Sequence, residues 1–314
     1  MATNESNNTK YTHKSTEAKE WEMDYALKKQ PVIAIGKIGW TTNEFNDASG
    51  LALSESNQLI YIADKDNGRI QVVTYEGNFV TSFGQGKLVH PWGIAVTEDY
   101  VSVTDYHLHT LIKFSDLKLR MIGTRGSEKG ELAYPRGLCS DYNGDLYVAD
   151  CGNNRVCIFT ENLTFVNCLG TQQLCYPRDV KVIPNSIAVL NGGPICVKFY
   201  SRSGHLIYSC LDQDGIVLDP LFFCLDPIGN ILMSDFYYDK IMILSPSGKL
   251  IHSIGRTGHG RGDFVEPCAS ESNETKSSSL DEWLKYPMSK PYDDAYYSYD
   301  GEPEFNVETD FVLT

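Results

Sequence analysis

The sequence predicts an all-β protein, a β-propeller of four-stranded blades, and three observations support this fold class. Similar stretches recur along the chain with a period of 42 to 44 residues, which matches one propeller blade. Each repeat holds about four short runs rich in Val, Ile, Tyr and Phe, which are typical of strands. Gly, Asn and Asp separate these runs, as tight turns between short strands require.

A proline marks the first strand of four repeats and defines the period. The four are Pro91, Pro135, Pro177 and Pro220, and Ala48 holds the same position one period upstream. Proline is tolerated at the first residue of a strand because its missing N–H costs little there. A single blade exposes both faces of its sheet, so the blades must stack around an axis to bury their apolar side chains. The third-strand residues Phe114 and Phe159 are expected to be buried between blades.

An aspartate that ends the second strand is the other landmark of the repeat. The pattern P-x-G-[IL], followed by [IV]-A-D-x-x-N-x-R-[IV] and a terminal F-G, resembles the NHL repeat found in tripartite-motif NHL proteins. The match is best in the first and third repeats. The first keeps Asp64, Asn67 and Arg69, and the third keeps Asp150, Asn153 and Arg155.

The other repeats depart from this pattern. The second keeps Asp105 but has Thr110 in place of the arginine, and the fifth has Asp235 and Lys240. The fourth is interpreted as having lost the motif, with Leu190 and Ile195 at the two positions.

The resemblance covers residues 31–268 and implies a propeller that commonly has six blades. We expect six blade positions with the sixth degenerate or incomplete, and a five-bladed ring is the alternative. Segment 30–39 is expected to supply an outer strand that completes the last blade, and segment 260–270 opens the sixth unit. No further [IV]-A-D landmark follows, and the one remaining candidate strand is at 304–314.

Both flanks of the propeller differ from it in composition. Residues 1–30 are expected to be a disordered N-terminus with a short amphipathic helix at 15–29. Residues 269–314 hold 11 acidic residues against three lysines and are expected to be an acidic disordered tail.

Charge and cysteine usage limit the classes of function. The formal net charge of −14 repels phosphate backbones, so general nucleic-acid affinity is disfavoured and no DNA partner is expected. Nine cysteines without a C-x-x-C pair indicate reduced thiols and a cytoplasmic protein. Neither an apolar leader nor a membrane-length apolar run is visible, so no membrane partner is expected.

Loops at one face of the propeller carry the candidate partner-binding residues. The loops between blades and those joining second and third strands should emerge together, and aromatic and arginine side chains on a rigid rim are typical of interface hot spots. The candidates are Trp92, Tyr106, His107, His109, Arg136, Arg178, Tyr237, Tyr238 and Lys240. Arg69 and Arg155 each follow an aspartate by five residues, so we assign them to structural ion pairs of the repeat. The structural positions are therefore Asp64, Arg69, Asp105, Asp150, Arg155 and Asp235.

No catalytic constellation, cofactor motif or metal site is predicted. His107 and His109, with His90, form a set of imidazoles that a metal could use, but loop polarity explains them better. Arg261, Gly262 and Asp263 spell an integrin-type tripeptide, but they fall where the repeat demands glycines.

These observations favour a non-enzymatic binding scaffold whose rim recognises protein partners. The resemblance implies a substrate adaptor linked to ubiquitin ligase systems, although the chain shows no RING or B-box array and would need another subunit to transfer ubiquitin. RNA binding through a local basic rim is the alternative that the resemblance allows. An enzyme similar to the peptide-amidating lyases is a minor alternative. The sequence leaves the oligomeric state open.

Overall fold

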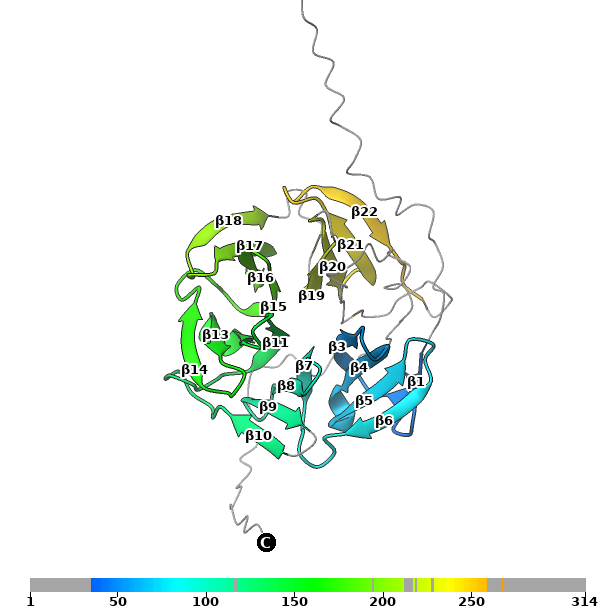
Figure 1. Cartoon of the computed structure of the whole chain (residues 1–314). Coiled ribbons are helices and arrows are strands. Elements are labelled where there is room, and N and C mark those ends of the chain that lie inside the picture. The colour runs from blue at the N-terminus through cyan, green and yellow to red at the C-terminus, as the bar shows by residue number, and fades with distance from the viewer. Residues whose placement is uncertain are drawn as a thin grey trace, which may run out of the picture.

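Five four-stranded antiparallel sheets stand around a common axis as the blades of a propeller (Figure 1). The computed structural model describes residues 35–258 and Pro267, except for 116–117, 194, 212–216, 218 and 227–228. The predicted fold class, an all-β propeller of four-stranded blades, is confirmed. Five blades lie within the described residues, as in the five-bladed alternative.

Each blade is a meander of four strands that follow one another along the chain. Blade one holds β3 (Ala48–Ser54), β4 (Leu59–Asp64), β5 (Arg69–Thr74) and β6 (Phe79–Phe83). Blade two holds β7 (Pro91–Val96), β8 (Val101–Asp105), β9 (Thr110–Ser115) and β10 (Lys118–Ile122). Blade three holds β11 (Pro135–Ser140), β12 (Leu146–Asp150), β13 (Arg155–Phe159) and β14 (Phe165–Leu169). Blade four holds β15 (Pro177–Ile183), β16 (Ser186–Gly192), β17 (Ile195–Ser201) and β18 (Leu206–Leu211). Blade five holds β19 (Pro220–Leu225), β20 (Ile231–Asp235), β21 (Lys240–Leu244) and β22 (Leu250–Ile254).

The first strand of every blade lines the axis and the fourth lies at the outside (Figure 1). Second strands are sandwiched between neighbouring blades, and every described residue of β8, β12 and β20 is buried. β12 consequently reads as a continuous apolar run up to Asp150. β8 and β20 also bury polar side chains, namely Ser102, Thr104 and Ser234.

Apolar side chains of adjacent blades form a series of cores. Ile70 and Val103 belong to the cluster between blades one and two, and Phe159 anchors the cluster between blades two and three. Val156 and Val189 meet between blades three and four. Complete burial of a side chain of this size contributes about 1.5–3 kcal/mol, so each cluster contributes strongly to blade stacking.

A glycine two residues after the repeat proline allows successive first strands to approach closely. A Cβ added at Gly137 would lie 2.1 Å from Oδ1 of Asp179 and 2.6 Å from its Cα. At Gly93 it would lie 2.6 Å from the carbonyl oxygen of Arg136. The glycine of the motif is therefore required where the backbone of the next blade passes.

Blades four and five replace this glycine, and the packing of first strands changes there. The strands pack in series, β3 on β7, β7 on β11, β11 on β15 and β15 on β19. Asp179 takes the glycine position in blade four, where its carboxylate accepts the N–H of Phe223 at 3.3 Å. Phe222 takes the position in blade five and is buried. Within the described residues, no strand of blade five packs on blade one in the way that successive blades pack.

The segment that precedes blade one folds onto that blade. β1 (Lys37–Ile38) pairs in parallel with β2 (Glu44–Phe45), and Lys37 lies opposite Glu44. Ile35 and Phe45 pack on the side of blade one that carries Ile60. The described part of segment 30–39 thus covers blade one, and no strand of the five described blades pairs with it.

Several expectations fall outside the described residues. These are the helix at 15–29, the candidate strand at 304–314, the tripeptide at 261–263 and, apart from Pro267, the sixth unit that opens at 260–270. Among the helices that the structure describes, none has the length and apolarity needed to cross a membrane.

Candidate partner-binding site

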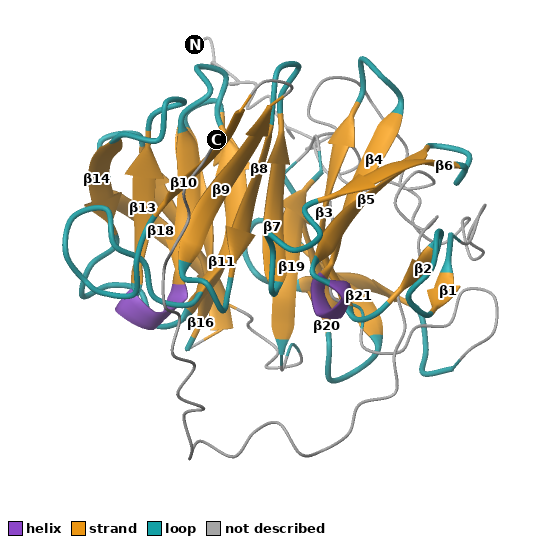
Figure 2. Cartoon of the chain, turned by 90° about the horizontal axis from the view of Figure 1, so that it is seen from below, coloured by secondary structure: helices purple, strands orange, loops and turns teal. Residues whose placement is uncertain are grey.

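The two loop types expected to form a rim do emerge at the same end of the blades. Each repeat proline is the cross-strand partner of a residue at or next to the end of the second strand, as in the pairs Pro91–Asp105 and Pro135–Asp150. The residue after the proline and the turn after the aspartate are therefore neighbours. Figure 2 shows the 3-10 turns η1 (Lys65–Asn67) and η2 (Cys151–Asn153), which follow the aspartates of blades one and three, at one edge of the molecule.

Buried aspartates organise these loops. The Asp105 carboxylate accepts the N–H groups of Val89 and His90, which precede the first strand, and those of His107 and Leu108 in the turn. A carboxylate that accepts several N–H donors holds both loops in one arrangement. Asp64, Asp150 and Asp235 also lie at the ends of second strands and are fully buried.

Arg69 and Arg155 form ion pairs inside their own blades. Each Nε donates to an aspartate oxygen at 2.7 Å, Arg69 to Asp64 and Arg155 to Asp150. The Arg155 guanidinium also donates to the carbonyl oxygens of Ser127, Glu128 and Glu131. The donors of both arginines are thereby engaged within the propeller.

Blade four keeps a polar residue at the aspartate position, which corrects the sequence alignment. Asn191, rather than Leu190, is the cross-strand partner of Pro177, and its Oδ1 accepts the N–H of Cys175 at 2.7 Å. An asparagine oxygen supplies the acceptor that the carboxylate supplies in the other blades. The alignment was shifted by one residue because Leu190 ends a run of apolar residues like those of other second strands.

Aromatic and cationic side chains of three successive blades meet at this end of the propeller. The rim cluster consists of Lys65, Trp92, Tyr106, Tyr134 and Arg136. Arg136 lies over the rings of Trp92 and Tyr106, with distances of 4.9 and 5.7 Å to the ring centroids. Lys65 lies 5.1 Å from the Trp92 ring. Tyr106 also packs on Trp92 and Tyr134, with centroids 5.4 and 5.0 Å apart.

Polar groups of the rim cluster retain capacity to bind. Trp92 Nε1 and Arg136 Nε are buried, and neither has a hydrogen-bond partner within the described residues. Arg136 forms no ion pair with a carboxylate there either. Burial raises the pKa of the Tyr106 hydroxyl, whereas the charge of Arg136 lowers it. An arginine that is stacked on rings but lacks a carboxylate is suited to receive an acceptor from outside.

Lys65 and Tyr134 were missing from the sequence-based candidates. Lys65 follows Asp64 as Tyr106 follows Asp105, and Tyr134 precedes Pro135 as His90 precedes Pro91. Both residues could therefore have been identified from the sequence, because they occupy the same positions in the repeat as Tyr106 and His90.

Arg178 occupies the same repeat position as Trp92 and Arg136 but is tied to the next blade. Its Nη1 is paired with the Asp219 carboxylate and donates to the carbonyl oxygen of Pro220 at 2.9 Å. The arginine joins blade four to blade five, so its removal would affect blade packing as well as the rim.

The histidines near the rim take separate roles. The rings of His90 and His107 lie 4.0 Å apart, and burial lowers the pKa of His90. His109 is buried, and its Nδ1 accepts the N–H of Tyr134 at 3.0 Å. His109 therefore holds the backbone of the loop that precedes β11. No group of three His, Cys, Asp or Glu side chains in the described part of the chain is placed to hold a metal.

The blade-five candidates lie apart from the rim cluster. Tyr237 and Tyr238 are exposed and contact one another edge to face, with centroids 5.2 Å apart. Lys240 is half-buried and stands opposite Asp235 in the sheet. The structure brings Trp92, Tyr106, His107 and Arg136 together, but it places these three residues elsewhere on the ring.

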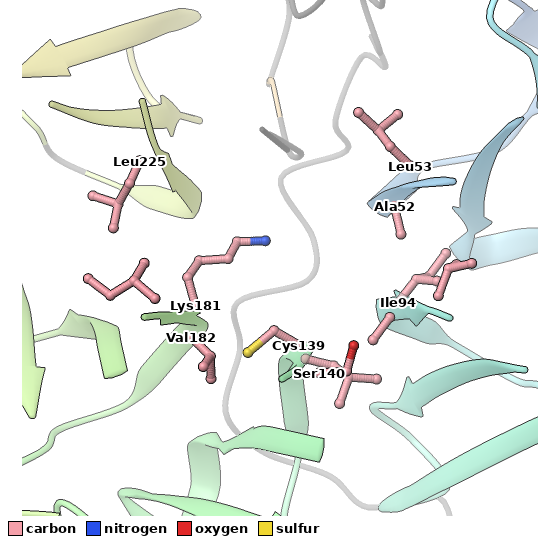
Figure 3. A pocket seen from close by; sticks show the side chains of 12 residues that line it. Ala52, Leu53, Ile94, Cys139, Ser140, Lys181, Val182 and Leu225 are labelled. Atoms are coloured by element: carbon pink, nitrogen blue, oxygen red, sulfur yellow. The ribbon is translucent and has the colours of Figure 1, made fainter. Parts of the chain in front are cut away.

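A pocket on the axis is lined by residues from the first strands of all five blades (Figure 3). Most of the residues that line it are apolar, and Lys181 and Cys139 point into it. The Lys181 ammonium lies 3.8 Å from the Asp179 carboxylate. The carboxylate of Asp179, on the same strand, thus balances the positive charge of Lys181.

The repeats identify the class of protein. The family model for the NHL repeat matches residues 45–73 and 132–159, within blades one and three. The chain carries NHL repeats and is an NHL-repeat β-propeller.

Two curated relatives are similar over part of the chain. Protein brain tumor of Drosophila melanogaster is 30% identical over 146 residues, covering 43% of this chain and 14% of that protein. B-box type zinc finger protein ncl-1 of Caenorhabditis elegans is 27% identical over 146 residues, covering 42% of this chain and 16% of that protein. The aligned part of the chain spans less than a fifth of either relative.

Solved structures share the fold at low identity. A chain of the nidogen/laminin complex has a TM-score of 0.59 and 16% identity, covering 68% of this chain and 82% of that one. A streptogramin B lyase has a TM-score of 0.52 and 14% identity, covering 66% of this chain and 67% of that one. At these identities the likeness shows the propeller fold alone.

Proposed function

We propose that this protein is a non-enzymatic scaffold that binds a protein partner through the rim cluster. The observation that carries the proposal is Arg136, which lies over the rings of Trp92 and Tyr106 and forms no ion pair within the described residues. Arginine and large aromatic side chains supply most of the binding energy in protein interfaces. A partner carboxylate at this point would pair with the guanidinium charge of Arg136, to which the described residues supply no carboxylate.

The backbone beneath the cluster is held in place before any partner arrives. Thr104 donates to the carbonyl oxygen of Arg136 in blade three and accepts the N–H of Gly93 at 2.8 Å. Tyr106 N–H donates to the carbonyl oxygen of His90 at 3.0 Å. A preorganised surface loses little conformational entropy on binding, which favours affinity.

A link to ubiquitin ligase systems is part of the proposal, and the name of one relative supports it. One C. elegans relative is described as a RING finger protein, nhl-1, and it is 38% identical over 50 residues that cover 16% of this chain and 5% of that protein. We propose that this chain presents a bound protein as a substrate adaptor in the cytoplasm, with another subunit supplying the transfer chemistry.

The double variant Trp92→Ala/Arg136→Ala tests the site. Arg178 is left intact because it joins blades four and five. Pull-down or proximity labelling should capture a discrete set of proteins with wild type and lose it with the variant. Loss of about 2 kcal/mol or more, as at a hot spot, corresponds to roughly 30-fold weaker binding.

A matched control removes an aromatic ring and an arginine elsewhere. Tyr142 is 87% exposed in the turn between β11 and β12, and Arg120 is exposed on β10. Tyr142→Ala/Arg120→Ala should bind as wild type does. Full binding by the rim variant would refute the site, and loss of crosslinked RNA instead of protein would favour the RNA alternative.

A further inference from the structure

Two cysteines of blade three face one another across neighbouring strands. Cys157 on β13 and Cys168 on β14 are direct cross-strand partners, and their Sγ atoms lie 2.9 Å apart. Directly opposed residues on antiparallel strands have Cα atoms roughly 4.5–5.5 Å apart, which falls in the range that a disulfide spans. The strand register therefore places the two sulfur atoms next to one another, at a strand separation that a disulfide can span.

The two thiols differ in a way that suits sequential oxidation. Cys157 is buried, whereas Cys168 is half-buried and more accessible from solvent. The hydrogen bond between the two thiols lowers the pKa of Cys168, and the charge of Arg155 acts in the same direction. The same hydrogen bond and burial raise the pKa of Cys157. Cys168 is thus the thiol of the pair that ionises more readily, and the thiolate is the reactive form.

We propose that Cys157 and Cys168 form a modification site at which a peroxide produces a cross-strand disulfide. The Cys168 thiolate attacks one peroxide oxygen, which forms a sulfenic acid and releases hydroxide. The Cys157 sulfur then attacks the Cys168 sulfur, the S–S bond forms, and the hydroxyl leaves with the Cys157 proton as water. The hydroxide takes up the proton first lost by Cys168, so two thiols and one hydrogen peroxide yield one disulfide and two waters.

Peptide mapping of the full chain after treatment with hydrogen peroxide tests the proposal. Trypsin cleaves after Arg155 and Arg178, and cleavage after Glu161 separates Cys157 from Cys168. Alkylated, peroxide-treated protein should therefore yield peptides 156–161 and 162–178 joined by a bond that dithiothreitol breaks. Reduced protein should yield the two peptides separately.

Three variants assign the bond. Peptide 162–178 also holds Cys175, so Cys175→Ser must retain the crosslink, whereas Cys157→Ser and Cys168→Ser must lose it. In Cys157→Ser, Cys168 should accumulate as sulfenic acid, detected by dimedone, because the resolving thiol is missing. A crosslink that persists in Cys168→Ser, or peroxide-treated wild type without a crosslink, would overturn the proposal.

Discussion

One backbone position in the repeat keeps its conformation while its residue changes. The fourth residue after the second-strand aspartate has φ between 54° and 59° in four blades; these residues are Gly68, His109, Asn154 and Asp239. Positive φ is tolerated by glycine and, among other residues, best by Asn, Asp and His. Asn154 Oδ1 accepts the N–H of Tyr176 at 2.7 Å, just as His109 Nδ1 accepts that of Tyr134. In blade two the acceptor is the imidazole of His109, which can be protonated.

We expect the substitution His109→Asn to reduce the loss of stability in mild acid. Burial, with the nearby charge of Arg125, lowers the pKa of folded His109 below 6.5. Its contribution to stability is therefore complete above pH 6.5 and is lost as the pH falls from there through the folded pKa. Asparagine supplies an acceptor and tolerates the same φ, but it does not titrate.

Urea unfolding of both proteins between pH 7.5 and pH 5 checks this expectation. His90 also has a lowered pKa, so some pH dependence should remain in the variant. Identical pH dependence in variant and wild type would contradict the role given to His109.

At the scale of the element, two phenylalanines in equivalent third-strand positions should differ in their contribution to stability. Both were predicted to be buried between blades. Phe159 is fully buried, whereas Phe114 is half-buried and contacts Phe83 edge to face at 5.0 Å. Phe159→Ala should cost about 3–5 kcal/mol because it leaves a closed cavity, and Phe114→Ala should cost less. Chemical denaturation measures both, and equal losses would contradict the difference in burial.

The close approach of first strands makes Gly137 a second test at this scale. An added methyl group would meet the backbone and carboxylate of Asp179, so Gly137→Ala should destabilise by about 1–3 kcal/mol through overpacking. Gly193→Ala is the control, because its Cβ would meet only Cys175 Sγ at an ordinary 3.6 Å. Thermal unfolding should separate the two variants, and similar midpoints would count against close strand packing.

For the whole molecule, stacking in series predicts an ordered pattern of amide hydrogen exchange. Second strands β8, β12 and β16 are hydrogen-bonded on both sides and covered by a blade on each face. Their amides should exchange most slowly, and those of the outer strands β10 and β14 should exchange faster, because opening the edge of a blade requires less free energy. Hydrogen exchange followed by mass spectrometry resolves these strands. Equal protection in β12 and β14 would contradict the prediction.

Much of the candidate site could be predicted because its positions recur with the repeat. Trp92 and Arg136 follow the repeat prolines, and Tyr106 follows a repeat aspartate, so all three were identified as rim residues. Their mutual contacts could not be predicted, because they join residues of different blades. Arg178 has the same repeat position as Arg136, yet Asp219 of the next blade changes its role.

By itself, the amino-acid sequence determined the blade period, the strand order and the end of each blade at which the candidate partner-binding loops emerge. These properties follow from turn residues, apolar runs and a proline and an aspartate that are cross-strand neighbours, all of which act within one repeat. Only the tertiary structure decided which side chains meet. The stacking of Arg136 on Trp92 and the burial of Phe222 depend on how blades pack, and the contact of Cys157 with Cys168 depends on strand register. Such contacts are fixed by packing distances in space, which the order of residues along the chain does not specify.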